Sequence, residues 1–230
     1  MLNIRSLPWA EIHDDLDRDG FARTGPVLTP DQCDELQALY DDGAFRSTIQ
    51  MARHRFGEGE YKYFDNPLPP LVAQLREGLY PELARAANRW AGWLGDEPYP
   101  ETLDEFLATC HAAGQTRPTP LILRYGEGGY NALHQDLYGD VAFPFQALTV
   151  LSRKGEDFDG GESVLIEQRP RQQSRAHVIS LSQGELLFFP TRYRPAKGSK
   201  GHYRATLRHG VATLTRGERL GLGVIFHDAR

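Results

Sequence analysis

The stretch LHQDLYG places His134 and Asp136 one residue apart, and both side-chain types bind metals. In an extended strand, residues i and i+2 project to the same face, so an imidazole and a carboxylate would reach into one space. Together they would supply two ligands of a 2-His-1-carboxylate site, which leaves open coordination positions on Fe(II). A single His-x-Asp pair is weakly specific, so the prediction depends on a third ligand elsewhere in the chain.

The candidate for this third ligand is His209 in YRATLRHGVATL, and Arg219 follows it by ten residues across the turn LTRGE. One strand would then carry the histidine and its partner strand the guanidinium. Inside a barrel, a planar guanidinium can hold a carboxylate through two parallel hydrogen bonds. Because an unpaired buried arginine is costly, this pattern indicates a bound anion, such as the far carboxylate of a dicarboxylate.

Four segments carry a resemblance to a known family, and in chain order they are RYGEGGYNALHQD, FDGGE, LSQGELLFFP and HGVATLTRGERLGLGVIF. They run from about Arg124 to Phe226. On these segments the chain resembles the 2-oxoglutarate- and Fe(II)-dependent dioxygenases, particularly the branch related to prolyl 4-hydroxylases. The part before them, including MARHRFGEGEYKYF, is similar to an uncharacterised bacterial group of that superfamily.

The resemblance implies roles for five residues. His134, Asp136 and His209 would ligate Fe(II). Arg219 would pair with the C5 carboxylate of 2-oxoglutarate, and Tyr125 would donate a hydrogen bond to the same cosubstrate. The implied reaction consumes 2-oxoglutarate and O2, releases succinate and CO2, and hydroxylates a C–H bond, with ascorbate as an additional reductant. A carboxylate at position 136 argues against the halogenating variant, which has a small residue there.

One position departs from the family's pattern. Many members carry a serine two residues after the arginine, whereas this chain has Gly221 after Arg219. A second hydrogen-bond donor to the C5 carboxylate must then come from another residue. Tyr125 and Thr149 are the two alternatives.

The elements that must position these residues fall into two parts. Before residue 118, amphipathic patterns predict helices near 9–18, 29–43, 67–95 (with a break near Pro81) and 101–114, and a hairpin over 45–64. From 118 onward, eight short β-rich runs alternate with turns, which is typical of a sandwich or barrel. We therefore expect an α+β fold, a double-stranded β-helix (jelly roll) with N-terminal helices packed against one sheet.

Residues 1–230 would form a single Fe(II)/2-oxoglutarate dioxygenase domain. Residues 1–117 would supply mainly helical support and substrate-side segments, and residues 118–230 the jelly-roll core. No apolar run approaches 18 residues and the N-terminus lacks a secretion signal, so we expect a cytoplasmic protein without a membrane partner. Cys33 and Cys110 match no zinc or redox spacing and are predicted to be core residues.

A net charge of -5 argues against general affinity for nucleic acid, but the average conceals a basic segment between Gln168 and His209. It contains one acidic residue, Glu185, and nine basic ones: Arg169, Arg171, Arg175, Arg192, Arg194, Lys197, Lys200, Arg204 and Arg208. A cationic loop near the metal could hold phosphates of a nucleic acid, or another polyanion such as an acidic peptide. Alternatively, it is a solvated loop that keeps strand edges from pairing with other chains.

Three hypotheses for function remain open. The leading one is hydroxylation of a C–H bond in a protein or amino-acid side chain, or in a small metabolite. The second is oxidative demethylation of an alkylated nucleobase in damaged DNA or RNA, presented as a flipped or single-stranded base. The third is a non-catalytic jelly-roll binding module. Among the other histidines, His54 belongs to a structural hairpin or a substrate-side lip, and His227 is predicted to be a packing or surface residue.

Overall fold

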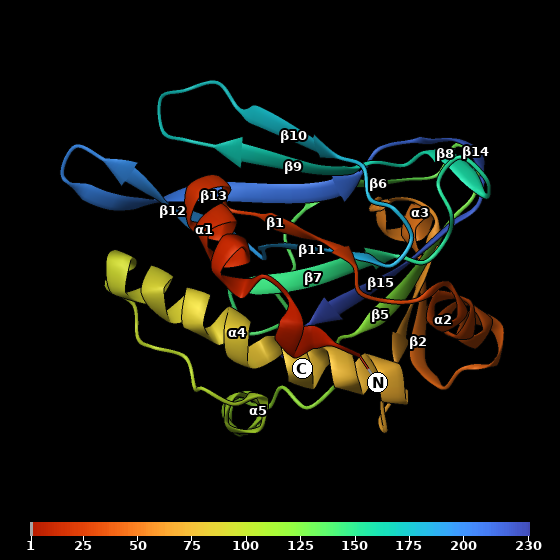
Figure 1. The fold of residues 1–230 in the computed structure, drawn as a ribbon, viewed down its shortest axis with the longest axis horizontal. Helices are drawn as coiled ribbons and strands as arrows, with labels where there is room; N and C mark the ends of the chain where they lie inside the picture. Colours follow the sequence, from red (N-terminus) through yellow and green to blue (C-terminus); the bar gives the residue numbers. More distant parts are fainter. Residues whose placement is uncertain (1) are drawn as a thin grey trace.

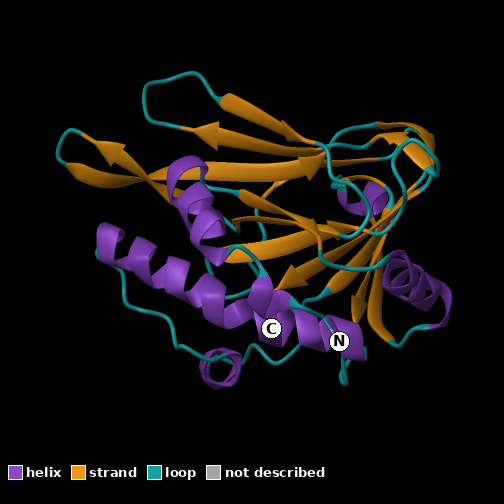
Figure 2. Ribbon diagram, viewed as in Figure 1, coloured by secondary structure: helices purple, strands orange, loops and turns teal. Residues whose placement is uncertain are grey.

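Two antiparallel sheets face each other in the computed structural model, which describes residues 2–230 (Figures 1 and 2). The larger sheet has the order β1-β11-β7-β15-β5-β4-β2, and the smaller has the order β10-β9-β13-β6-β3, with β12 paired to β13. Strands β8 and β14 form a separate pair. The strands are β1 (Ala22–Pro26), β2 (Phe45–Gln50), β3 (Gly57–Glu58), β4 (Glu60–Phe64), β5 (Leu121–Tyr125), β6 (Tyr130–His134), β7 (Phe145–Val150), β8 (Phe158–Gly160), β9 (Ser163–Gln168), β10 (Arg175–Ile179), β11 (Glu185–Pro190), β12 (Tyr193–Gly198), β13 (Gly201–Val211), β14 (Leu214–Gly217) and β15 (Arg219–Ile225).

Helices cover the outer face of the larger sheet, so the predicted jelly roll with helices against one sheet is confirmed (Figure 2). The helical elements are η1 (Ile4–Ser6), α1 (Trp9–Asp19), α2 (Pro30–Asp42), α3 (Met51–His54), α4 (Pro70–Leu94) and α5 (Leu103–Ala112). One continuous core joins α1, α2, α4 and α5 to that face of the sheet. Thr29 caps α2 through a capping box with Gln32, which satisfies two backbone N–H groups at the helix start.

Helix α4 is a single helix of 25 residues, so the predicted break near Pro81 is wrong. A proline inside a helix removes one backbone hydrogen bond and crowds the preceding turn. The buried face of α4 runs past this point without interruption, with Leu79 and Leu83 on either side fully buried. Packing of that face outweighs the local cost. Among the described residues, no helix is long and apolar enough to cross a membrane.

Residues 190–204, the part of the basic segment that was expected to be a loop before His209, instead form a β-hairpin of β12 and the first half of β13. Pro195 lies inside β12 and faces Arg204 across the pair. A proline is tolerated there because β12 pairs on one side only, so its missing N–H is not needed by a second neighbour. This strand was not predicted from the sequence, because proline and glycine normally interrupt strand patterns.

The predicted hairpin over 45–64 is present as the β2–β4 pair, but its connection contains the short helix α3 and strand β3. Strand β3 leaves the larger sheet and pairs with β6 of the smaller one. This connection therefore crosses between the two sheets at the start of β6, opposite Tyr130 and Asn131. Arg55 ends α3 in the left-handed conformation, with φ of 60°, which turns the chain toward β3.

Candidate metal and cosubstrate site

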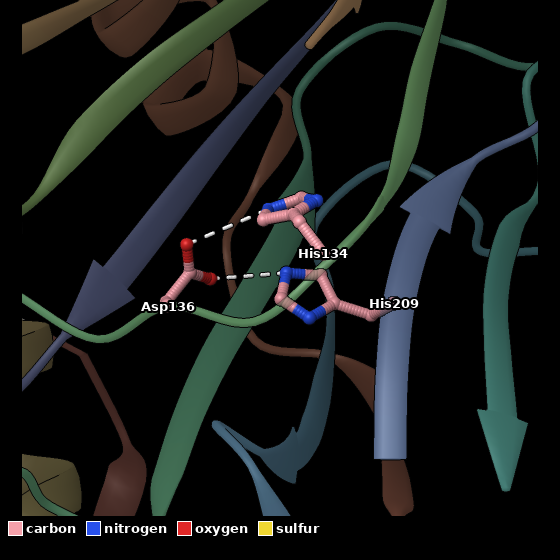
Figure 3. A group of neighbouring side chains, drawn as sticks. All are labelled: His134, Asp136 and His209. Carbon is pink, nitrogen blue, oxygen red and sulfur yellow. Dashed lines mark ion pairs between the residues drawn. The ribbon is translucent and has the colours of Figure 1, made fainter. Parts of the chain in front are cut away.

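Two strands and a loop bring His134, Asp136 and His209 together, as Figure 3 shows. His209 on β13 lies directly opposite His134 on β6, and Asp136 follows β6 by two residues. Their ligand atoms all lie within 4.8 Å of one another. The Nε2 atom of His209 is 3.0 Å from Asp136 Oδ2, and that of His134 is 3.5 Å from Oδ1. The two histidines and the carboxylate therefore converge on one point.

Two further contacts orient these side chains. The Nδ1 atom of His134 lies 2.8 Å from the carbonyl oxygen of Ala132, so a proton on Nδ1 leaves the Nε2 lone pair free for a metal. Tyr138 donates a hydrogen bond of 2.7 Å to Asp136 Oδ1. Such contacts fix the tautomer and the orientation of metal ligands.

The electrostatics of the cluster keep its carboxylate ionised. Burial alone would raise the pKa of Asp136, but the charge of His209 and hydrogen bonds from both histidines outweigh it and hold that pKa well below its usual range. Burial lowers the pKa of His209, which favours a neutral imidazole. Two imidazoles and one carboxylate are the donor set of non-haem Fe(II) oxygenases, so these residues fit that metal.

Arg219 lies at the start of β15 with 1% of its surface exposed, and its Nε, Nη1 and Nη2 atoms have no hydrogen-bond partner among the described residues. Burial lowers the pKa of its guanidinium. A buried cation without a partner is expensive, so this geometry fits the carboxylate of a bound cosubstrate. The side chain lies in the same cavity as the metal cluster.

Tyr125 faces Arg219 across the β5–β15 pair, with the guanidinium carbon 5.8 Å from its ring centre. Its hydroxyl oxygen accepts a hydrogen bond of 3.2 Å from Asn131, which leaves its own O–H free to donate to a ligand. Burial raises the pKa of Tyr125, so the hydroxyl keeps its proton. This placement agrees with the expectation that Tyr125 is a donor beside Arg219.

Thr149, one of the two expected donors to the C5 carboxylate, lies outside the cavity, and Ser163, for which no role was expected, lines it. Leu148 and Val150 face the interior between the sheets, so Thr149 between them faces the helices and lies outside the cavity. Ser163, at the start of β9, lines the cavity with Arg219, and its buried hydroxyl has no partner among the described residues. Sequence reasoning missed Ser163, although it lies two residues after the Gly160–Gly161 turn.

The cavity has a volume of about 280 Å³ and contains all three members of the metal cluster together with Arg219 and Tyr125. Aromatic and aliphatic side chains form most of its wall. Phe56 and Leu133 line it and are each 46% exposed, so they mark its mouth. His54 stacks on Phe56 with ring centres 5.4 Å apart, which places the segment after α3 at that mouth.

Ion pairs neutralise part of the basic segment. Arg169 and the buried Arg194 both pair with Glu167, and Arg204 pairs with Asp96. Six exposed cations have no ion-pair partner within residues 2–230, and they are Arg171, Arg175, Arg192, Lys197, Lys200 and Arg208. Most lie on the β9–β10 and β12–β13 hairpins, which project from the same side of the molecule (Figure 1).

Two of these residues have their backbone next to the metal cluster. Arg208 immediately precedes His209. Gln135, between His134 and Asp136, donates hydrogen bonds of 2.8 Å to the carbonyl oxygens of Arg192 and Leu207. Only the backbone at positions 192 and 208 is thus placed near the cluster, because Arg208 is adjacent to His209 on an extended strand and its side chain points to the opposite face of the smaller sheet.

Comparisons with known proteins agree with this geometry. Residues 59–229 match the family Oxygenase-NA, described as "Oxygenase, catalysing oxidative methylation of damaged DNA". An uncharacterized protein of Mycobacterium tuberculosis (strain ATCC 25618 / H37Rv) is 47% identical over 185 residues, which cover 80% of this chain and 78% of the relative.

Similar solved structures include a Pseudomonas putida prolyl-4-hydroxylase, with a TM-score of 0.58 and 18% identity over 96% of this chain and 99% of that one. A 2OG-Fe(II) oxygenase family oxidoreductase from Burkholderia pseudomallei has a TM-score of 0.55 and 16% identity over 96% and 92% of the two chains. At these identities the likeness shows the fold.

Proposed function

The chain belongs to the Oxygenase-NA family of 2-oxoglutarate- and Fe(II)-dependent oxygenases, and we propose that it removes alkyl groups from damaged nucleobases by hydroxylating them. It is an oxidoreductase whose family requires Fe(II), 2-oxoglutarate and O2. The family match over residues 59–229 carries the choice of substrate, because the description of that family names damaged DNA.

The proposed reaction balances with the cosubstrates of the family. One oxygen atom enters succinate as 2-oxoglutarate loses CO2, and the other enters a C–H bond of an N-methyl group as a hydroxyl. The resulting N-hydroxymethyl group breaks at its N–C bond: the electron pair of that bond stays on the ring nitrogen of the cationic base, the hydroxyl proton leaves to solvent, and formaldehyde is released. Bound iron supplies the oxidising power for this C–H cleavage. Ascorbate is proposed only as an auxiliary reductant.

The residues of this chain would divide the work. His134, Asp136 and His209 would hold the metal, and Tyr138 would keep the Asp136 carboxylate in position. Arg219 would bind the far carboxylate of 2-oxoglutarate. These assignments rest on the convergent ligand atoms and on the unpartnered guanidinium described above.

The unpaired cations support a nucleic-acid substrate rather than a protein side chain or metabolite. Phosphates are bound mainly by exposed lysine and arginine, and the six unpaired cations are exposed on or next to the two projecting hairpins. Because the cluster lies inside a cavity, the target base must leave a duplex stack or come from a single strand. The likeness to prolyl 4-hydroxylases extends to the fold only.

The experiment is intact-mass analysis of a single-stranded oligonucleotide that carries one N-methylated base, incubated with Fe(II), 2-oxoglutarate and O2. We expect loss of the methyl group by wild-type protein and none by Asp136→Ala. Charge removal at Lys197 and Lys200 should raise the oligonucleotide KM and weaken its salt dependence, because each lost phosphate contact reduces the slope by about 0.7 for a single strand. An unchanged mass with wild-type protein, together with succinate formation on a peptide panel, would contradict the proposed substrate.

A further inference from the structure

Gln146 presents an unused amide to the cavity. It lies on β7, is 4% exposed and lines the cavity, and its Nε2 atom has no hydrogen-bond partner among the described residues. Burying an amide without a partner costs free energy, so buried amides are normally hydrogen-bonded. Neither metal binding nor cosubstrate binding, as described above, uses this side chain.

A second buried glutamine shows how this fold satisfies an amide when its role is structural. Gln115 is fully buried, donates to the carbonyl oxygens of Val141 and Asp228 at 2.8 and 2.6 Å, and accepts from Val141 N–H at 2.8 Å. It therefore holds a loop to the C-terminal segment. The Nε2 atom of Gln146 has no such hydrogen bonds, so a structural role like that of Gln115 does not explain an amide at position 146.

The strand register places Gln146 level with the metal cluster and away from the cosubstrate arginine. Gln146 lies opposite Phe189 on β11 and opposite Ile225 on β15, and β7 runs between these strands (Figure 1). The Phe189 ring packs against the His209 ring with centres 4.8 Å apart. Arg219 lies six residues before Ile225 on β15, roughly 20 Å along the strand.

The surroundings of Gln146 are flat and apolar. Phe189 and Ile225 are its cross-strand neighbours, and Tyr63 and Ile225 belong to one hydrophobic cluster at this end of the cavity. Aromatic walls stack on a planar heterocycle, and one amide among them can then make directional hydrogen bonds to its edge. The combination resembles a pocket that reads a flipped base.

We propose that Gln146 reads the edge of the substrate base, an inference that rests on the proposed function. An alkyl group on the pairing edge must point toward the metal cluster, so the amide meets the edge on the other side. There adenine offers an N–H donor next to a ring-nitrogen acceptor, the pair that a glutamine amide binds bidentately, whereas cytosine offers only the donor. Gln146 therefore sets a preference for 1-methyladenine over 3-methylcytosine.

The test compares kcat/KM on two otherwise identical single-stranded oligonucleotides, one with 1-methyladenine and one with 3-methylcytosine. Wild-type protein should prefer the adenine substrate. In Gln146→Leu this ratio should fall by about 5- to 150-fold, the factor that corresponds to one bidentate amide–base pair. The KM for 2-oxoglutarate should stay unchanged, because Arg219 lies at the other end of the cavity. Gln146→Glu, which keeps the shape but loses the donor, should change the ratio in the same direction.

Thermal unfolding separates recognition from a structural role. Gln146→Leu should melt at or above the wild-type temperature, since it removes an unsatisfied buried amide, whereas Gln115→Leu should melt several degrees lower. An unchanged ratio in a folded Gln146→Leu protein that still demethylates both substrates would overturn this inference alone. No turnover of either oligonucleotide by wild-type protein would overturn the proposed function and this inference together. A destabilised Gln146→Leu protein with an unchanged ratio would assign the residue a structural role.

Discussion

Replacing Arg219 by methionine should weaken cosubstrate binding strongly without harming the fold. The guanidinium is 1% exposed and all three of its nitrogen atoms lack partners among the described residues. A charge-assisted hydrogen bond contributes about 1.5–3 kcal/mol. Two such bonds to one carboxylate would contribute about 3–6 kcal/mol, so 2-oxoglutarate should bind about 10²- to 10⁴-fold more weakly at about 1.4 kcal/mol per tenfold.

The effect of the same substitution on stability should be opposite in sign to that of an ordinary core truncation. A buried charge without a partner opposes folding, so Arg219→Met should be at least as stable as wild type when no cosubstrate is added. With 2-oxoglutarate at 100 times its Kd and a divalent metal, wild type should gain about 2.7 kcal/mol and the variant almost nothing. In a domain of this size that gain corresponds to a rise in Tm of roughly 5–11 °C.

The assay is a pair of thermal melts, with and without 2-oxoglutarate, in the presence of Mn(II) as an unreactive metal. Arg219→Lys is the matched control, because it keeps the charge but loses the planar fork, and its 2-oxoglutarate affinity should be intermediate. If Arg219→Met bound 2-oxoglutarate within threefold of wild type, the assignment of Arg219 to the far carboxylate would be refuted.

Three further predictions follow from buried polar contacts. Burial lowers the pKa of His227 to about 4, below its unfolded value near 6.5, so its contribution to stability is complete above pH 6.5 and is lost as pH falls toward 4. Urea unfolding from pH 7 to 4.5 should lose up to roughly 3 kcal/mol through this group, and less in His227→Gln. Tyr138→Phe should weaken metal affinity about 10- to 100-fold in a direct titration, because Asp136 loses its hydrogen bond. Arg76→Met should cost about 3–5 kcal/mol in urea unfolding, because Asp228 would stay buried without its 2.7 Å ion pair.

Spacing together with the family resemblance predicted that His134, Asp136 and His209 would lie close together and that Arg219 would line the same cavity. His134 and Asp136 are near neighbours, so local geometry fixes their arrangement. The expectation that Arg219 lies on the partner strand of His209 is wrong: His209 is on β13 of the smaller sheet and Arg219 on β15 of the larger one, with β14 between them in sequence. The jelly roll followed from the repeated β-rich runs. Strand β12 and the uninterrupted helix α4 were not predicted. Both form because tertiary packing overrides the local effect of proline.

Residues that matter because their buried polar atoms lack a hydrogen-bond partner could not be predicted from the sequence. Ser163 and Gln146 are ordinary strand residues until the fold shows each of them buried against the cavity without a hydrogen bond. The ion pair between Arg204 and Asp96 was equally hidden, because the two residues lie far apart in the sequence. Local charge therefore overstated the number of cations that remain free.

The most direct test of the proposed dealkylation is the stoichiometry of its two products. Wild-type protein with Fe(II), 2-oxoglutarate and O2 should release one formaldehyde for each succinate on a single-stranded oligonucleotide that carries 1-methyladenine. Asp136→Ala should release neither product, and the unmethylated oligonucleotide should yield no formaldehyde. Succinate formed at the same rate with methylated and unmethylated oligonucleotide, and without formaldehyde, would contradict the proposal that a damaged base is the substrate.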